Sequence, residues 1–144
     1  MKLTTRSEYA LLALLDLARR GGTEPVSVTT IAKAHDISPK FLEQILLALK
    51  HAGYVRSAKG QRGGYTLAKA ADRICLAETI RLLDGALAPT ESVSRYFYEP
   101  TPIEKEQGLV RVFQDIRDYV ADKLEHTTLA DICGRTPPKK GKRS

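Results

Sequence analysis

A tight turn at residues 36–38 separates two short segments that both have helical periodicity. The second segment has a strong start signal, because Ser38 is a good N-cap and Pro39 suits the first helical position. Two helices joined so closely predict a helix–turn–helix. The segments span about 28–35 and 39–51, and their predicted buried residues are Ile31, Ala32, Ala34, Phe41, Leu42, Ile45, Leu46 and Leu49.

A glycine-rich loop at residues 58–64 lies between two β-prone runs, 54–57 and 65–68. The runs predict a β-hairpin with a flexible tip. The glycines could also indicate a phosphate loop for a nucleotide, but the loop matches neither the dinucleotide nor the P-loop fingerprint. A helix–turn–helix followed by a hairpin is the pattern of a winged helix–turn–helix.

The remaining segments are predicted to be mostly helical. Thr5 and Glu8 have the spacing of a capping box, with Thr5 as the N-cap of an apolar helix that ends at Gly21. Further helical segments are expected at 77–83, 107–125 and 128–132. The expected fold class is therefore mainly α with a small β-hairpin wing: a winged helix–turn–helix domain plus a long dimerisation helix. The expected domains are a DNA-binding domain at 1–85, a linker or loop at 86–106, a dimerisation helix with a docking turn at 107–135, and a disordered basic tail at 136–144.

The length of 144 residues suits one domain whose core needs no disulfide or metal. The most apolar stretch, 9–18, contains Asp16 and is too short to span a bilayer. The first residues lack the features of a secretory signal. Cys75 and Cys133 stand too far apart in the sequence to form a CxxC motif. Together these features favour a cytoplasmic protein.

Charge is distributed unevenly along the chain. Residues 1–73 hold 12 Lys and Arg against 6 Asp and Glu, whereas residues 74–135 hold 7 against 11. The simplest explanation of the basic first half is a polyanionic partner such as double-stranded DNA, although a solvated basic face would look the same in the sequence.

The expected DNA contacts lie at the start of the second helix of the helix–turn–helix and at the tip of the wing. The serine hydroxyl of Ser38 can donate or accept, Lys40 can reach a phosphate or a guanine, and Glu43 can accept from a cytosine amino group. In the wing, cations among glycines can enter a narrow minor groove. The candidate DNA-binding residues are Thr4, Ser38, Pro39, Lys40, Glu43, Lys59, Gln61 and Arg62.

Several segments resemble the Rrf2 family of bacterial winged helix–turn–helix transcriptional regulators. The segments are 1–10 and 14–18 near the N-terminus, the predicted recognition helix at 37–45, the wing at 56–65, and two later stretches at 80–85 and 128–132. The resemblance is close over about 1–85 and looser over 107–132. It implies a homodimer, paired through the long helix, that binds a pseudo-palindromic operator.

The sequence departs from this family where its cluster-binding members carry three cysteines. Residues 91–99 contain no cysteine and no histidine, and neither Cys75 nor Cys133 fits that pattern. Because iron–sulfur clusters are held chiefly by thiolates, no cofactor and no metal ligand are expected. A sensor with an atypical cluster site that uses Glu8 or His35 stays as an alternative, although Glu8 is expected to cap a helix and His35 to be an ordinary surface residue.

The segment 86–106 contains three adjacent aromatic residues, Tyr96, Phe97 and Tyr98. In a loop they could cover a partner subunit or line a pocket for an unknown effector. Cys133, beside Arg135, could be open to oxidation, whereas Cys75 is expected to act as a small apolar residue.

The helix at 107–125 carries a broad apolar stripe that must be covered. Pairing with the same helix of a second subunit would cover it, and the alternative is a monomer in which the helix folds back on the first helix. The candidate dimerisation residues are Leu109, Val112, Phe113, Ile116, Tyr119 and Val120, and Leu124 continues the stripe.

No arrangement of His35, His51 and His126 indicates a metal or nucleophile motif, so an enzyme is not expected. The sequence therefore predicts a DNA-binding regulator, most simply a repressor, that acts without a cluster. The alternative of a different class is a protein-interaction module that uses the winged domain.

Overall fold

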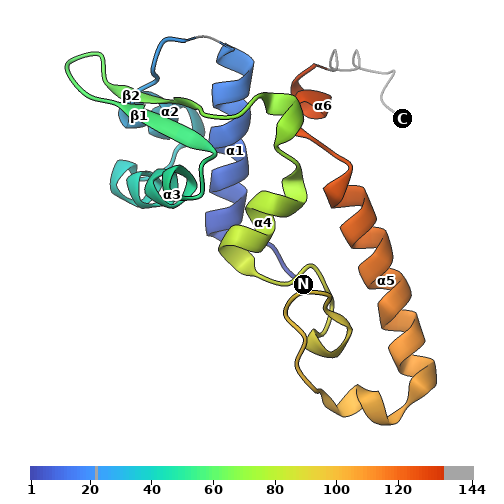
Figure 1. Cartoon of the computed structure of the whole chain (residues 1–144). Coiled ribbons are helices and arrows are strands. Elements are labelled where there is room, and N and C mark those ends of the chain that lie inside the picture. The colour runs from blue at the N-terminus through green and yellow to red at the C-terminus, as the bar shows by residue number, and fades with distance from the viewer. Residues whose placement is uncertain (22, 135–144) are drawn as a thin grey trace, which may run out of the picture.

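Six α-helices, one two-stranded hairpin and three short 3₁₀ turns form the part of the chain that the computed structural model describes, residues 1–21 and 23–134 (Figure 1). The mainly α fold with a small hairpin agrees with the prediction from the sequence. In chain order the elements are α1 (Thr5–Arg20), α2 (Val28–His35), α3 (Pro39–His51), β1 (Val55–Ala58), β2 (Gly64–Leu67), η1 (Ala71–Arg73), α4 (Leu76–Asp84), η2 (Glu91–Val93), η3 (Pro102–Lys105), α5 (Gln107–Glu125) and α6 (Leu129–Cys133).

Helix α1 is the centre of the core, because it contacts α2, α3, β2, α4 and α6. The predicted capping box at its start is wrong: Thr4, not Thr5, is the N-cap, and the Thr4 hydroxyl accepts from the Ser7 amide at 3.2 Å. The Thr4 hydroxyl and amide also donate to the carboxylate of Asp84 at the end of α4. This contact holds Thr4 in the extended conformation of an N-cap, and no local pattern could have revealed it.

Helices α2 and α3 form the predicted helix–turn–helix, with Asp36 in the left-handed conformation between them (φ 54°). The predicted buried residues of α3 are confirmed, and Phe41, which is half-buried, packs edge-on against Tyr9 of α1. In α2 the expectation for Ala34 is wrong, because its side chain is exposed. At 100° per residue, the face shared by Ile31 and Ala32 continues to His35 and leaves Ala34 on the outside.

The hairpin pairs β1 with β2 in an antiparallel register that sets Val55 opposite Leu67 and Ala58 opposite Gly64. Val55 is buried in the main core, whereas Arg56, Ser57 and Ala58 are exposed as the strand leaves the body. The wing is therefore anchored at its base and projects at its tip.

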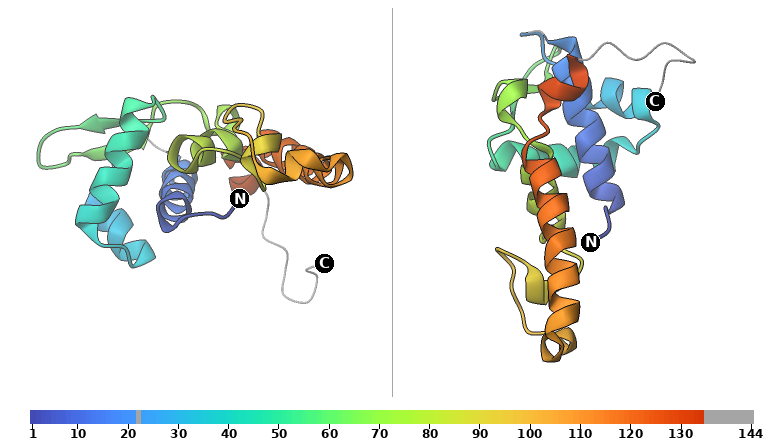
Figure 2. Two further views of the ribbon diagram at one scale, coloured as in Figure 1. Left: turned by 90° about the horizontal axis from the view of Figure 1, so that it is seen from below. Right: turned by 90° about the vertical axis from the view of Figure 1, so that its right-hand side faces the viewer.

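The C-terminal part of the fold is built around a second, smaller core of Ala77, Ile80 and Leu87. The loop 86–106 packs against its own subunit, since Leu87, Ala88, Val93 and Ser94 are buried. Helix α5 runs alongside α4 and extends beyond the body as an arm (Figure 2). The last described helix, α6, returns to the body, where Leu129 is fully buried in the main core.

Among the described residues, no helix is both long enough and apolar enough to cross a membrane. The predicted tail at 136–144 lies outside the described residues.

Candidate nucleic-acid interface

The exposed face of α3 begins at its N-terminus. Ser38, Pro39, Lys40 and Glu43 are all exposed, and they are carried by a helix whose opposite face is fixed in the core. The Ser38 hydroxyl accepts from the Phe41 amide at 3.5 Å and keeps its own hydrogen for another acceptor. The structure therefore brings these four candidates together on one solvent-facing surface.

Two further residues of α3, Gln44 and Leu47, share this exposed surface. Leu47 is 45% exposed and lies one turn beyond Glu43. Neither residue was among the candidates from the sequence, although the spacing of the buried residues Leu42, Ile45, Leu46 and Leu49 already places Leu47 off their stripe. An exposed leucine at this position can contact a thymine methyl group.

The tip of the wing presents Lys59, Gln61 and Arg62 to solvent. No described residue pairs with the charged group of Lys59 or Arg62. Gly60 has φ 104°, a left-handed conformation that favours glycine and turns the chain at the tip. The wing thus offers two cations with no partner in the described part of the subunit.

A backbone bridge fixes the base of the wing to the loop before α2. The Val26 and Tyr65 amides each donate to the other's carbonyl, at 2.9 and 2.8 Å. A Cβ atom on Gly64 would lie 2.3 Å from the Val26 carbonyl oxygen, so only glycine allows this approach. The loop before α2 therefore sets the direction of the wing.

Tyr65 also connects the wing with α3. Burial raises the pKa of its hydroxyl, and the nearby charge of Glu43 raises it further. The tyrosine therefore stays protonated, and this residue of β2 lies within electrostatic range of the exposed face of α3.

Thr4 is separate from the other candidates. Its hydroxyl and its amide both donate hydrogen bonds to Asp84. Figures 1 and 2 show the N-terminus near α4 and away from the wing. Its contact with DNA stays a prediction from the sequence alone.

The predicted apolar stripe of α5 divides into two faces. Val120 and Leu124 pack against the small core of α4, and Phe113 is half-buried. The other four, Leu109, Val112, Ile116 and Tyr119, are 45, 52, 43 and 72% exposed. Their spacing of 3, 4 and 3 residues puts them on one side of the helix, and we call them the outer face of α5. Val120 is predicted to lie in the dimer interface, but in the structure it packs against the small core of its own subunit. Its role in dimerisation stays a prediction.

Arginines fasten α5 and the preceding loop to the body. Arg81 donates to Glu125 at 2.6 Å, and Arg117 donates both to the Val93 carbonyl at 2.9 Å and to Asp118 at 2.7 Å. Hydrogen bonds from Arg117 and Arg95 lower the pKa of the Asp118 carboxyl. The inner side of α5 is thus held by charged contacts as well as by the small core.

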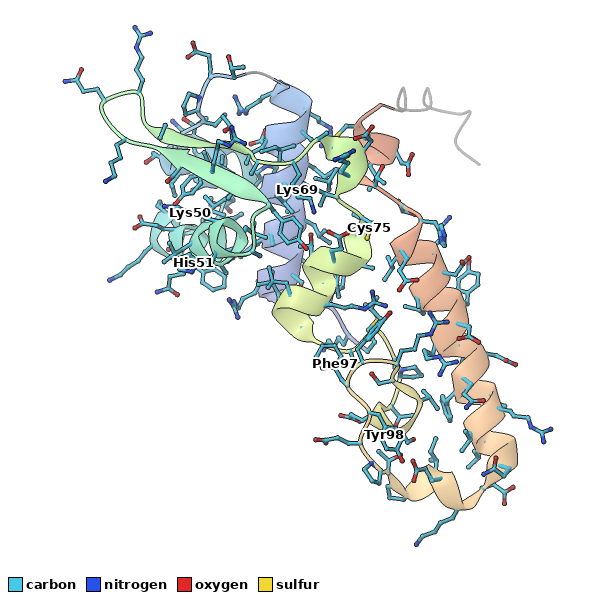
Figure 3. The ribbon with its side chains drawn as sticks, viewed as in Figure 1. Lys50, His51, Lys69, Cys75, Phe97 and Tyr98 are labelled. Carbon is cyan, nitrogen blue, oxygen red and sulfur yellow. The ribbon has the colours of Figure 1, made fainter. Side chains whose placement is uncertain are left out.

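The aromatic residues Tyr96, Phe97 and Tyr98 are exposed. Tyr96 lies under the guanidinium of Arg81, 4.8 Å from the ring centre, and the Tyr98 hydroxyl donates to Glu104. Figure 3 shows Phe97 and Tyr98 in the loop beyond α4, and Cys75 at the opposite end of that helix. The aromatic residues therefore form a solvent-facing group next to α5.

A family profile described as "Iron-dependent Transcriptional regulator", with the name Rrf2, matches residues 3–135. The chain belongs to the Rrf2 family. This confirms the resemblance noted in the sequence.

Individual members of the Rrf2 family agree with this assignment. The transcriptional regulator CymR of Bacillus subtilis is 34% identical over 136 residues, which cover 94% of this chain and 92% of that protein. The regulator IscR of Cereibacter sphaeroides is 41% identical over 134 residues, 92% of this chain and 86% of that protein. The solved structure of the B. subtilis CymR, described as a global cysteine regulator, matches with a TM-score of 0.77 over 94% of this chain and 98% of that one.

This Rrf2 protein is therefore a DNA-binding transcriptional regulator of winged helix–turn–helix fold, and it is not an enzyme. In helix–turn–helix proteins the second helix lies in the major groove of DNA, and α3 is the second helix of that motif here.

The family description names iron, but the side chains of this chain do not fit an iron–sulfur cluster. The loop 86–106 has no cysteine. Cys75 packs against the small core at the start of α4, and the Cys133 thiol points to the Leu15 carbonyl, 3.7 Å away. Within residues 1–21 and 23–134, no group of three or more His, Cys, Asp and Glu is placed to hold a metal ion.

Glu8 and His35 are the two residues that the sequence offers as alternative cluster ligands. Glu8 is exposed on α1. His35 is not an ordinary surface residue, because only 22% of its side chain is exposed and its Nε2 lies 3.5 Å from Oδ2 of Asp16 on α1. His35 thus lies against α1, and the absence of a cofactor stays a prediction.

Proposed function

We propose that this Rrf2 protein acts as a homodimer that binds a pseudo-palindromic operator and represses transcription there. One observation carries the proposal: the exposed polar start of α3 and the cationic wing tip extend from the same end of the subunit (Figure 1). In such an arrangement α3 enters the major groove and the wing reaches the adjacent minor groove. Repression follows most simply, because a bound dimer excludes other proteins from the same stretch of DNA.

The dimer is proposed from the outer face of α5. Four large apolar side chains in one row are costly to leave in water, at about 25 cal/mol per Å² of apolar surface. A second copy of α5 covers the row in the isologous way that is usual for dimers. The two recognition helices are then set at a fixed separation, so that half-sites lie a multiple of about 10–10.5 base pairs apart.

Within each half-site, we assign base contacts to Ser38, Lys40 and Glu43, and minor-groove or phosphate contacts to Lys59, Gln61 and Arg62. Pro39 contributes by fixing the first turn of α3. The regulator is proposed to act without an iron–sulfur cluster, because its side chains do not supply the cysteine thiolates that hold such a cluster. A protein that acts on the chromosome of a bacterium works in the cytoplasm, which is the location we propose.

The experiment is selection of bound sequences from random double-stranded DNA by the purified protein. We expect enrichment of one motif with two-fold symmetry. Failure to enrich any motif contradicts sequence-specific binding and favours a protein-interaction module. The salt dependence of binding separates the two, since contacts with phosphates weaken steeply as salt rises.

A further inference from the structure

A groove of about 570 Å³ lies between the wing and the start of α2. One wall is formed by Gln61, Arg62 and Gly63 of the wing, and the other by Arg20 at the end of α1 together with Ser27 and Thr30. Neither Arg20 nor Thr30 belongs to the surface of α3 or to the wing tip. The groove therefore adds residues from two other helices to this end of the molecule.

The two walls are held at a fixed distance by the backbone. The Val26–Tyr65 bridge joins the loop before α2 to β2 at the base of the groove. On the wing side, a Cβ atom on Gly63 would lie 2.6 Å from the Ala58 carbonyl oxygen and 2.8 Å from that of Gly60. The tip thus adopts a turn that only glycine allows, and this turn places Arg62 beside the groove.

The groove offers hydrogen-bond donors from both sides. The Nε atom of Arg20 bonds to Asp16 at 3.1 Å, which leaves the terminal nitrogens of a side chain that is 43% exposed. The hydroxyls of Ser27 and Thr30 are 2.8 Å apart, so that one hydrogen of the pair is used and the other stays available. Glu24 is the one carboxylate among the described residues that line the groove.

The position of the groove fits the geometry of B-form DNA. A single sugar–phosphate strand separates the major groove from the adjacent minor groove, so a protein that places α3 in one and its wing in the other must straddle that strand. The first helix of a helix–turn–helix crosses the backbone there. The strand then passes between α2 and the wing, where this groove lies.

We propose that the groove binds the sugar–phosphate backbone of one DNA strand, with Arg20 and Arg62 contacting phosphates from opposite walls. The inference rests on the proposed function, and it goes further by assigning α1 and the start of α2 to the interface. Contacts with phosphates carry no sequence information, so the groove contributes affinity and orientation rather than sequence preference. Glu24 opposes the strand by charge repulsion.

The test compares Arg20→Gln with Arg19→Gln, a matched control that removes the same charge one residue away and outside the groove. Binding is followed by fluorescence anisotropy of a 30-base-pair duplex over a range of KCl concentrations. One duplex carries the sequence that the wild type selects, and the other is a shuffled version. A melting curve of each variant confirms that it is folded.

We expect Arg20→Gln to weaken binding to both duplexes by the same factor, roughly tenfold at low salt. The slope of log K against log salt should fall by about one unit per subunit. Glu24→Gln should strengthen binding to both duplexes several-fold. This second variant keeps the test valid if Arg20→Gln does not fold, because Glu24 is exposed.

The inference is overturned if Arg20→Gln binds like Arg19→Gln, or if Glu24→Gln leaves affinity unchanged. It is also overturned if inorganic phosphate, at constant ionic strength, binds the wild type through Arg20 without displacing DNA, since the groove would then hold a free anion and not the DNA backbone. A wild type that binds neither duplex contradicts the proposed function itself. A wild type that selects a motif but ignores the Arg20 substitution contradicts only the role of the groove.

Discussion

Arg81 of α4 donates a hydrogen bond to the carboxylate of Glu125 in α5, with Nη2 and Oε2 2.6 Å apart. The two side chains are only 20% and 28% exposed. Arg95 of the preceding loop approaches the same carboxylate at 3.9 Å, and Arg81 also lies over the ring of Tyr96. One carboxylate therefore joins α4, the loop and α5, which are the parts that orient the proposed dimerisation helix relative to the DNA-binding domain.

This contact predicts a specific dependence of stability on pH. The hydrogen bond from Arg81 lowers the pKa of the Glu125 carboxyl below its ordinary value. A depressed carboxyl pKa adds stability above the unfolded value, and this contribution is lost as the pH falls through the folded value. Glu125→Gln should therefore cost about 1 kcal/mol of unfolding free energy at pH 7 and progressively less below pH of about 4.5.

The measurement is urea denaturation of the wild type and Glu125→Gln at several pH values. The difference in unfolding free energy between the two proteins is compared at each pH, so that the titration of Asp118 and the other carboxyls cancels. Asp122→Asn is the matched control, because the Asp122 side chain is 78% exposed and lies 3.2 Å from His126, which is 76% exposed. A stability difference for Glu125→Gln that is the same at pH 7 and pH 3.5 would contradict the argument.

Gly64→Ala should detach the wing from the body. Its new Cβ atom would lie 2.3 Å from the Val26 carbonyl oxygen, and a backbone atom cannot move aside as a flexible side chain can. We expect a loss of about 2 kcal/mol or more in unfolding free energy, together with weaker DNA binding. Gly108→Ala makes the same chemical change near the start of α5, where nothing lies closer than 3.6 Å, and it should be neutral or stabilising. Equal stability of the two variants would count against the backbone bridge as the anchor of the wing.

The elements with strong local signals could be predicted from the sequence. Ser38 and Pro39 define the start of α3, and the glycines between two β-prone runs define the wing, because capping and turn geometry depend on neighbouring residues. The sequence also predicts the long helix with bounds close to the observed Gln107–Glu125, since its apolar period is sustained over its whole length.

Features that depend on distant contacts could not be predicted in this way. Thr4 is the N-cap of α1 in a conformation supported by Asp84, 80 positions away in the chain. The stripe of α5 looked continuous, because periodicity reveals which residues are apolar but not which partner covers each side. No pattern in the sequence indicates a DNA contact for Arg20. Arg20 and Arg62 line the same groove only because Val26 pairs with Tyr65 of β2.

Substitutions at α3 and at the wing tip should have different effects on DNA binding. Glu43→Ala should change which sequences are selected, with about 1–3 kcal/mol lost at the contacted base pair. Arg62→Ala should weaken binding to all sequences and reduce the salt slope by about one unit. Repeating the random-sequence selection with each variant checks both outcomes. An unchanged motif for Glu43→Ala would remove that residue from base recognition.

The protein should carry no iron–sulfur cluster even when it is purified without oxygen. The loop 86–106 lacks cysteine, and clusters need thiolate ligands. We expect no visible absorption and no stoichiometric iron or sulfide. If a cluster is found, Cys75→Ser and Cys133→Ser identify the thiolates that hold it, and the regulator would then belong with the sensors that use an atypical site.

The outer face of α5 should hold the dimer together. Val112→Asp with Ile116→Asp places two charges among side chains that are 52% and 43% exposed in the subunit, so the fold should tolerate them while the dimer does not. These positions are a sharper test than Phe113, which is half-buried and whose loss would also disturb the subunit.

We expect the double variant to sediment as a folded monomer and to lose operator binding, because halving the phosphate contacts removes most of the affinity. Arg111→Gln with Asp115→Asn is the control, since both residues are exposed on α5 but neither belongs to the outer apolar row. Sedimentation velocity at micromolar concentration, with circular dichroism to verify folding, gives the answer. If the wild type itself sediments as a monomer under these conditions, the pairing of α5 helices is wrong, and the row must be covered by another protein or by a rearrangement within the subunit.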